Sequence, residues 1–227
     1  MIIIGHRGAA GYEPENTLRS FEKAISLGVD MIEFDVQRCK SGELVVIHDD
    51  TVNRTTNGKG KIKDLNLDSL QKLDAGKGEH IPTLIETLEF INRRVKVDIE
   101  IKEDNVAEDV ATITESFISQ GWKNSDFLVT SRITTEVQTF RKINPNIPIG
   151  IIIHRADKIP SELAQSLKAE FIFLPELRAT KRTIQKLQSL DIKVSVYTHV
   201  ALNYFLQLPF LKRSGIDAIT SNKPDQL

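Results

Sequence analysis

Acidic residues at alternate positions occur twice in the first half of the chain. Glu33 and Asp35 lie two residues apart within an apolar run, and Asp98 and Glu100 do the same in a second run that continues to Lys102. Residues two apart in a strand point to the same face of the sheet. Carboxylates that converge from neighbouring strands repel one another, and a hard divalent cation such as Mg²⁺ or Ca²⁺, which prefers oxygen ligands, relieves that repulsion. The pattern favours a cation site, with pairing to nearby basic side chains as the alternative.

Two histidines, His6 and His48, end apolar runs and are each followed by a charged residue. Histidine is the side chain whose proton moves near neutral pH. Two histidines, a carboxylate-bound metal and an arginine or lysine make a set suited to phosphoryl transfer. In such a set the histidines act as general base and acid, and the cations bear the charge of the phosphate. His80 and His154 are expected on loops or the surface, outside the site.

Short runs rich in β-branched residues alternate with helical patterns along the chain. The runs cover residues 2–5, 29–36, 95–101, 127–130, 149–153, 171–174, 192–197 and 218–220. The helical patterns cover residues 17–27, 84–92, 106–120, 134–143, 161–167, 181–190 and 202–212. Such alternation is typical of parallel strands joined by right-handed crossovers, and about eight parallel strands close a barrel. We therefore predict an α/β fold, a (β/α)₈ TIM barrel, with its site at the carboxyl ends of the strands.

One further run, residues 43–48, follows the second strand too closely to be parallel to it. A parallel crossover needs about a dozen residues or more, whereas a Ser-Gly turn suits an antiparallel hairpin. We assign this run to an excursion, about residues 37–82, between the second and third parallel strands. Its remainder, residues 49–82, is polar and is expected to form a loop or lid over one end of the barrel. The chain, residues 1–227, is predicted to be a single domain.

The composition excludes several classes of protein. Of the 227 residues, 40% are hydrophobic and 27% are charged, which is typical of a globular chain. The net charge of -1 argues against binding nucleic acid through bulk electrostatics. The sequence has no run of about 18 apolar residues, so we expect no integral membrane segment. Its single cysteine and the lack of a secretory signal predict a reducing compartment, the cytoplasm.

Several short motifs stand in a characteristic order along the chain. The first half carries His6-Arg7-Gly8, Pro14-Glu15-Asn16-Thr17, Glu33-Phe34-Asp35-Val36 and His48-Asp49. Further along stand Arg54-Thr55-Thr56-Asn57-Gly58, Ile81-Pro82-Thr83-Leu84 and Ile99-Glu100-Ile101-Lys102. Taken in this order, the motifs resemble those of the glycerophosphodiester phosphodiesterases. The resemblance covers nearly the whole chain, and its specificity lies in the ordered set.

This resemblance implies a (β/α)₈ barrel that hydrolyses glycerophosphodiesters, which are small molecules, to glycerol 3-phosphate and an alcohol. It also assigns catalysis, metal binding and phosphate binding to particular residues. The implied acid–base pair is His6 and His48, the implied ligands of one divalent cation (Mg²⁺ or Ca²⁺) are Glu33, Asp35 and Glu100, and the implied phosphate-binding residues are Arg7 and Lys102.

The resemblance bears on four more positions, and at two of them this sequence departs from the family's pattern. It implies that Glu15 and Asn16 face the site from the loop after the first strand, although Asn16 is equally suited to cap the following helix. Tyr197 stands where the family commonly has tryptophan, and it would provide the aromatic wall beside the glycerol. Asn222 stands where an aspartate is frequent.

Two other functions fit parts of the pattern. A lysophospholipase D-like phosphodiesterase of similar barrel design would need an apolar rim or a membrane-docking surface. The polar excursion favours a soluble substrate instead. A catalytically inactive barrel that only binds phosphodiesters would be marked by the loss of a histidine or of a metal carboxylate, and all five of these residues are present.

Overall fold

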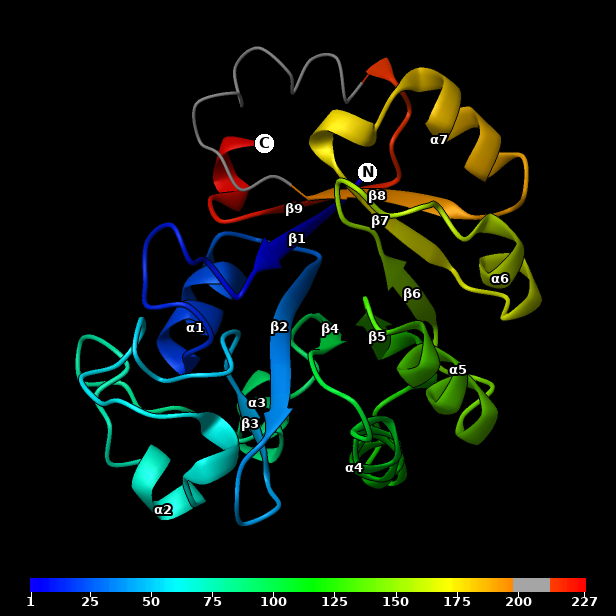
Figure 1. Ribbon diagram of the computed structural model, residues 1–227. Helices are drawn as coiled ribbons and strands as arrows, with labels where there is room; N and C mark the ends of the chain where they lie inside the picture. Colours follow the sequence, from blue (N-terminus) through cyan, green and yellow to red (C-terminus); the bar gives the residue numbers. More distant parts are fainter. Residues whose placement is uncertain (198–212) are drawn as a thin grey trace.

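The computed structural model describes residues 1–197 and 213–227, and it shows a closed barrel surrounded by helices (Figure 1). Eight parallel strands form the barrel: β1 (Ile2–His6), β2 (Met31–Arg38), β4 (Lys96–Ile101), β5 (Phe127–Ser131), β6 (Ile149–Ile152), β7 (Phe171–Pro175), β8 (Lys193–Tyr197) and β9 (Ala218–Ser221). Each strand pairs with the next around the ring, and β1 pairs with both β9 and β2, which closes it. The predicted (β/α)₈ barrel is confirmed.

Helices lie on the outside of the barrel, between successive strands (Figure 1). They are α1 (Leu18–Ser26), α3 (Leu84–Ile91), α4 (Ala107–Ser119), α5 (Thr134–Ile143), α6 (Ser161–Ser166) and α7 (Lys181–Gln188), with short 3₁₀ helices η2 (Asn124–Asp126), η3 (Glu176–Arg178) and η5 (Pro224–Gln226). The helix predicted at residues 202–212 lies outside the described residues. Across the described ranges, we find no helix with the length and apolar character needed to cross a bilayer. The cytoplasmic location stays a prediction.

Alternation along β2 separates polar from apolar side chains. Ile32 and Phe34 belong to the large apolar layer between the strands and the helices. Glu33 and Asp35 point to the opposite face, which is the inside of the barrel. A smaller apolar cluster lies inside the barrel, made of Ile4, Met31, Leu128, Phe171, Phe173 and Ala218. The acidic residues of β2 therefore lie next to an apolar floor, where they are shielded from water.

The excursion between β2 and β4 contains more structure than expected. β3 (Leu44–Val46) pairs antiparallel with the end of β2, as predicted, but is shorter than residues 43–48. The expected polar loop contains η1 (Ile62–Asp64), α2 (Leu67–Leu70) and a core of its own. This core comprises Cys39, Val45, Ile47, Val52, Ile62, Leu70, Ala75 and Ile81. Its members are spaced too irregularly for a helical or strand period to reveal them.

Candidate active site

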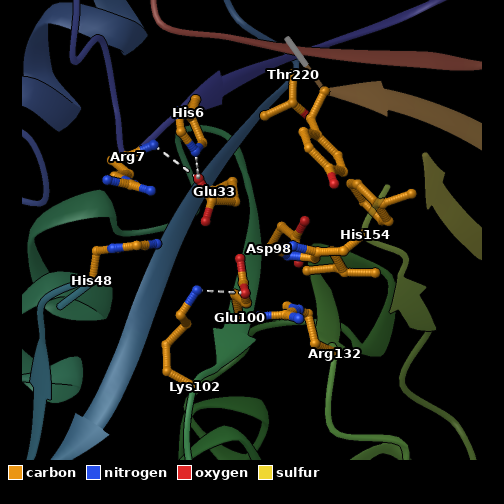
Figure 2. Close-up of a pocket in the computed structure, with 13 residues that line it drawn as sticks. His6, Arg7, Glu33, His48, Asp98, Glu100, Lys102, Arg132, His154 and Thr220 are labelled. Carbon is orange, nitrogen blue, oxygen red and sulfur yellow. Dashed lines mark hydrogen bonds and ion pairs between the residues drawn. The ribbon is translucent and has the colours of Figure 1, made fainter. Parts of the chain in front are cut away.

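Polar side chains meet in a cavity of about 270 Å³ at the carboxyl ends of the barrel strands (Figure 2). It is lined by His6, Arg7, Glu33, His48, Asp98, Glu100, Lys102, Arg132, Ile152, His154, Phe173, Tyr197 and Thr220. Of the residues singled out from the sequence, His6, Arg7, Glu33, His48, Glu100, Lys102 and Tyr197 line this cavity directly. The other three, Glu15, Asn16 and Asp35, contact Arg7 or one another just behind the cavity wall.

Three carboxylates converge on one side of this cavity. The parallel register pairs Asp35 of β2 with Glu100 of β4, and Glu33 lies on the same face of β2. One oxygen from each carboxylate lies within 4.8 Å of the other two. Within the described ranges, Oε1 of Glu33 and Oδ1 of Asn16 are buried and have no hydrogen-bond partner. The spacing, the all-oxygen donor set and these two unused oxygens fit a single hard divalent cation.

Basic side chains contact the same carboxylates. Arg7 Nε lies 3.2 Å from Asp35 Oδ2, and Lys102 Nζ lies 3.3 Å from Asp35 Oδ1. Lys102 Nζ also donates to Glu100 Oε1 at 2.8 Å, and the backbone N–H of Arg7 donates to Glu33 Oε2 at 2.9 Å. The ion pairs of the alternative interpretation therefore exist. Two basic side chains facing three carboxylates still leave one negative charge, so pairing alone does not neutralise the cluster when all three are ionised.

Burial and mutual repulsion shift the pKa values of these acids unequally. Burial raises the pKa of Glu33 well above its ordinary value, and the charges of Asp35 and Glu100 raise it further. Burial also raises the pKa of Glu100. Although burial opposes the shift, Lys102 and Arg7 hold the pKa of Asp35 below its ordinary value. Without a metal ion, Asp35 therefore stays ionised, and Glu33 is the carboxylate in which the charge is most costly.

The two histidine rings point into the cavity, each with a partner on its Nδ1 atom (Figure 2). His6 Nδ1 contacts Asn222 Oδ1 at 2.5 Å, and its Nε2 lies 3.9 Å from Glu33 Oε2. His48 Nδ1 contacts Asp49 Oδ1 at 2.6 Å. Burial lowers the pKa of His48, although the charge of a nearby carboxylate opposes this shift. Asn222 thus offers an amide oxygen to His6, whereas His48 has a carboxylate partner.

The loop after β1 brings two further predicted residues to the site. Asn16 Nδ2 donates to Asp35 Oδ2 at 2.9 Å, and Arg7 Nη1 donates to Glu15 Oε1 at 2.7 Å. Arg7 and Asn16 have φ angles of 50° and 58°, a left-handed conformation that residues other than glycine rarely adopt. The alternative role of Asn16 as a helix cap is wrong, because the side chain of Thr17 caps α1. The strained backbone instead aims both side chains at Asp35.

Residues 6–226 match the glycerophosphoryl diester phosphodiesterase family. The chain belongs to this family. It is 33% identical to a glycerophosphodiester phosphodiesterase of Caldanaerobacter subterraneus, with 100% of this chain and 96% of that protein aligned. A human lysophospholipase D is 30% identical over 67% of this chain and 52% of its own length. The structure of an Oleispira antarctica phosphodiesterase in complex with the product sn-glycerol-3-phosphate superposes with a TM-score of 0.89 and 27% identity, covering 100% of this chain and 94% of that one.

In this member of the glycerophosphoryl diester phosphodiesterase family, the position expected for His154 is wrong. His154, expected outside the site, lines the cavity, and its ring centre lies 6.5 Å from that of Tyr197. The hydroxyl of Tyr197 donates to the carbonyl of Ile153 at 2.7 Å, and burial raises its pKa to about 12. Arg132 also lines the cavity and was not predicted. Arg132 and His154 each come just after a barrel strand, but polar residues occupy that position in most turns, so this signal does not single them out.

Asp98, which the sequence places in the same alternating run as Glu100 but not among the metal ligands, also lines the cavity. It lies two residues before Glu100 on β4, is fully buried, and accepts a hydrogen bond from Thr130 Oγ1 at 2.7 Å. Burial raises its pKa well above the ordinary value. A carboxyl group with a raised pKa holds its proton, so Asp98 is better suited to supporting the floor of the cavity than to binding a cation.

Proposed function

We propose that this protein hydrolyses glycerophosphodiesters to sn-glycerol 3-phosphate and an alcohol, with residues 1–227 acting as one catalytic domain. The observation that supports this most strongly is that three carboxylates, two histidines and two basic side chains meet at one cavity. Membership of the glycerophosphoryl diester phosphodiesterase family supports the same reaction. So does the likeness to the Oleispira antarctica structure, which holds sn-glycerol-3-phosphate.

Glu33, Asp35 and Glu100 would hold one divalent cation, Mg²⁺ or Ca²⁺. When bound, the cation supplies positive charge beside the phosphate of the substrate. Arg7 and Lys102 border the same carboxylates, so their N–H groups are placed to bind the non-bridging oxygens of that phosphate. The divalent cation together with the two basic side chains would exceed the charge of the carboxylates by one. The site would then match the single negative charge of a phosphodiester.

His6 and His48 would move the protons of the reaction. One ring removes a proton from the attacking hydroxyl group, whether that of water or of the substrate itself, as the new P–O bond forms. The other ring protonates the oxygen of the departing alcohol as the old P–O bond breaks. The Nδ1 partners, Asn222 and Asp49, fix the orientation of each ring. Tyr197 would contact the glycerol as part of the cavity wall.

The surface that the structure describes favours a small water-soluble diester over a lysophospholipid. An acyl chain would need an extended apolar surface near the site. The large apolar side chains that are exposed within the described ranges are Met1, Ile85, Ile143 and Leu177, and none of them lines the cavity. An inactive binding barrel is disfavoured as well, because all the proposed catalytic and metal-binding side chains are brought together.

The proposal is tested by incubating the purified protein with glycerophosphodiesters and measuring the glycerol 3-phosphate that is formed. We expect hydrolysis of glycerophosphodiesters to stop after treatment with EDTA and to return when Mg²⁺ or Ca²⁺ is added alone, which also identifies the preferred metal. A lysophospholipid assayed in parallel should be a poor substrate. Absence of glycerol 3-phosphate with every diester and both metals would refute the proposed reaction, and full activity in EDTA would refute the role of the cation.

Asp49→Asn should lower kcat by about tenfold or more and change KM little. The carboxylate of Asp49 accepts from Nδ1 of His48, whereas an amide can also present N–H groups to that atom and so favour the wrong tautomer. Steady-state kinetics with one diester measures the effect. Asp50→Asn is the matched control, because Asp50 is exposed and adjacent in sequence, whereas it is Asp49 that contacts His48. Equal kcat values for the two variants would contradict the role of Asp49.

A further inference from the structure

Of the cavity-lining residues that the structure describes, two are exposed, and both are basic. Arg132 follows β5 and His154 follows β6, so they form the rim on the side away from Arg7 and His48 (Figure 2). The lining carboxylates are less exposed: Glu33 and Asp98 are buried, and Glu100 is partly buried. The exposed lining side chains that a substrate meets on this side are therefore basic.

Arg132 differs from the other cationic residues around the cavity. Arg7 is paired with Glu15 and Asp35, and Lys102 is paired with Glu100 and Asp35. Across residues 1–197 and 213–227, the side chain of Arg132 makes no hydrogen bond or ion pair. Its guanidinium group can donate two parallel hydrogen bonds to one carboxylate or phosphate group. With no such partner among the described residues, this guanidinium at the rim of the cavity is available to an anion brought by the substrate.

The turn that carries His154 is held in place by hydrogen bonds of its own. The backbone N–H of His154 donates to Asp157 Oδ2 at 2.8 Å. Arg178 Nη1 donates to the carbonyl of His154 at 3.2 Å and also to the carbonyl of Asp157. Asp157 is the one acidic residue in the sequence from 154 to 158, so this segment as a whole is basic. A turn with net basic character therefore lies at the rim that Arg132 also lines.

We propose that the cavity prefers glycerophosphodiesters whose alcohol carries an anionic group of its own, a carboxylate or a phosphate, and that Arg132 binds this group. This inference rests on the proposed hydrolysis of glycerophosphodiesters. An alcohol with a cationic group and no anion, such as choline, would instead face like charges at Arg132 and the following basic turn. Arg132 would therefore be a specificity residue, since it contacts the alcohol and not the reacting atoms.

Two substrates that differ by one carboxylate give the sharpest test. Glycerophosphoserine and glycerophosphoethanolamine share the phosphodiester and the ammonium group, and only the serine diester has the carboxylate. We expect the wild-type kcat/KM to be about tenfold or more higher for the serine diester, because a charge-assisted hydrogen bond from Arg132 to the carboxylate contributes that much binding. Arg132→Gln should remove that preference, mainly by raising KM for the serine diester. Arg182→Gln, an exposed arginine on α7, makes the same change in net charge and should keep the preference.

A binding measurement decides the inference independently of turnover. Calorimetric titration with O-phosphoserine and O-phosphoethanolamine should show the same preference for the carboxylate, and Arg132→Gln should abolish it. Failure of the wild-type protein to hydrolyse either diester would count against the proposed function, and the titration would still decide the role of Arg132. Equal affinities for the two ligands, or a preference that survives Arg132→Gln, would overturn the inference.

Discussion

Glu33→Gln should reduce glycerophosphodiester hydrolysis by a factor of about 100 or more and abolish metal binding, while the barrel stays folded. Loss of residues that only support metal ligands costs about 10–100-fold, so loss of a ligand should cost at least as much. Glutamine keeps the shape of the side chain but removes the charge. Isothermal titration with Mg²⁺ and Ca²⁺, together with kcat/KM, measures both effects. Glu108→Gln, an exposed residue of α4, is the control. Undiminished metal affinity in Glu33→Gln would rule out Glu33 as a ligand.

The same variant should be more stable than the wild-type protein when no metal is present. Burial raises the folded-state pKa of Glu33 above its unfolded value of about 4.3. Such a group adds to the free energy of unfolding while it is protonated. This stabilisation is complete below the unfolded pKa and is lost as the pH rises through the folded pKa. The advantage of glutamine should therefore be absent near pH 4 and grow at higher pH. With saturating metal the order should reverse, because only the wild-type protein gains stability by binding the ion.

Urea unfolding of both proteins near pH 4 and near pH 8, each with EDTA and with metal, measures these four differences. If Glu33→Gln is less stable than the wild-type protein in EDTA at the higher pH, the charge on Glu33 is not costly there. In that case the raised pKa of Glu33 is wrong, whatever the outcome for activity. Separating the two readouts matters, because a loss of activity alone could follow from a small displacement of the neighbouring Asp35.

The barrel could be predicted from the sequence because its signals are local and repeated. Each strand is a short β-branched run, and alternation along β2 alone shows that Glu33 and Asp35 share a face opposite Ile32 and Phe34. A parallel barrel then requires the ends of its strands to meet at one face. The convergence of Glu33 with Glu100 follows from that rule, even though they lie far apart in the sequence.

The excursion and the far rim of the cavity could not be predicted in the same way. The core of the excursion depends on Val52, Ile62 and Ile81, which are separated by polar stretches and have no common period. Arg132 and His154 are single polar residues after strands, a position that is occupied by polar residues in most turns. Which of them faces the cavity depends on where each strand ends, and strand ends are the least certain part of a pattern-based prediction.

His6→Ala and His48→Ala should each lower kcat by about 100-fold or more for a diester of an alkyl alcohol such as choline, as expected when a positioned acid or base is lost. The alkoxide of such an alcohol is strongly basic and needs a proton to leave. The two variants should differ with a diester of nitrophenol, because this weakly basic leaving group departs without being protonated. The variant that lacks the general acid should recover much of its rate with this substrate, and the variant that lacks the general base should not. His80→Ala is the control, because His80 does not line the cavity.

The contacts of the two rings explain why their roles should be separable. His6 Nδ1 faces the amide oxygen of Asn222, and His48 Nδ1 faces the carboxylate of Asp49, so the protonated ring is supported differently in the two cases. Two rings in such unlike surroundings are not interchangeable, and only one variant should be rescued by the nitrophenol diester. Rescue of both variants to the same extent, or of neither, would mean that His6 and His48 do not divide the transfer of protons between them.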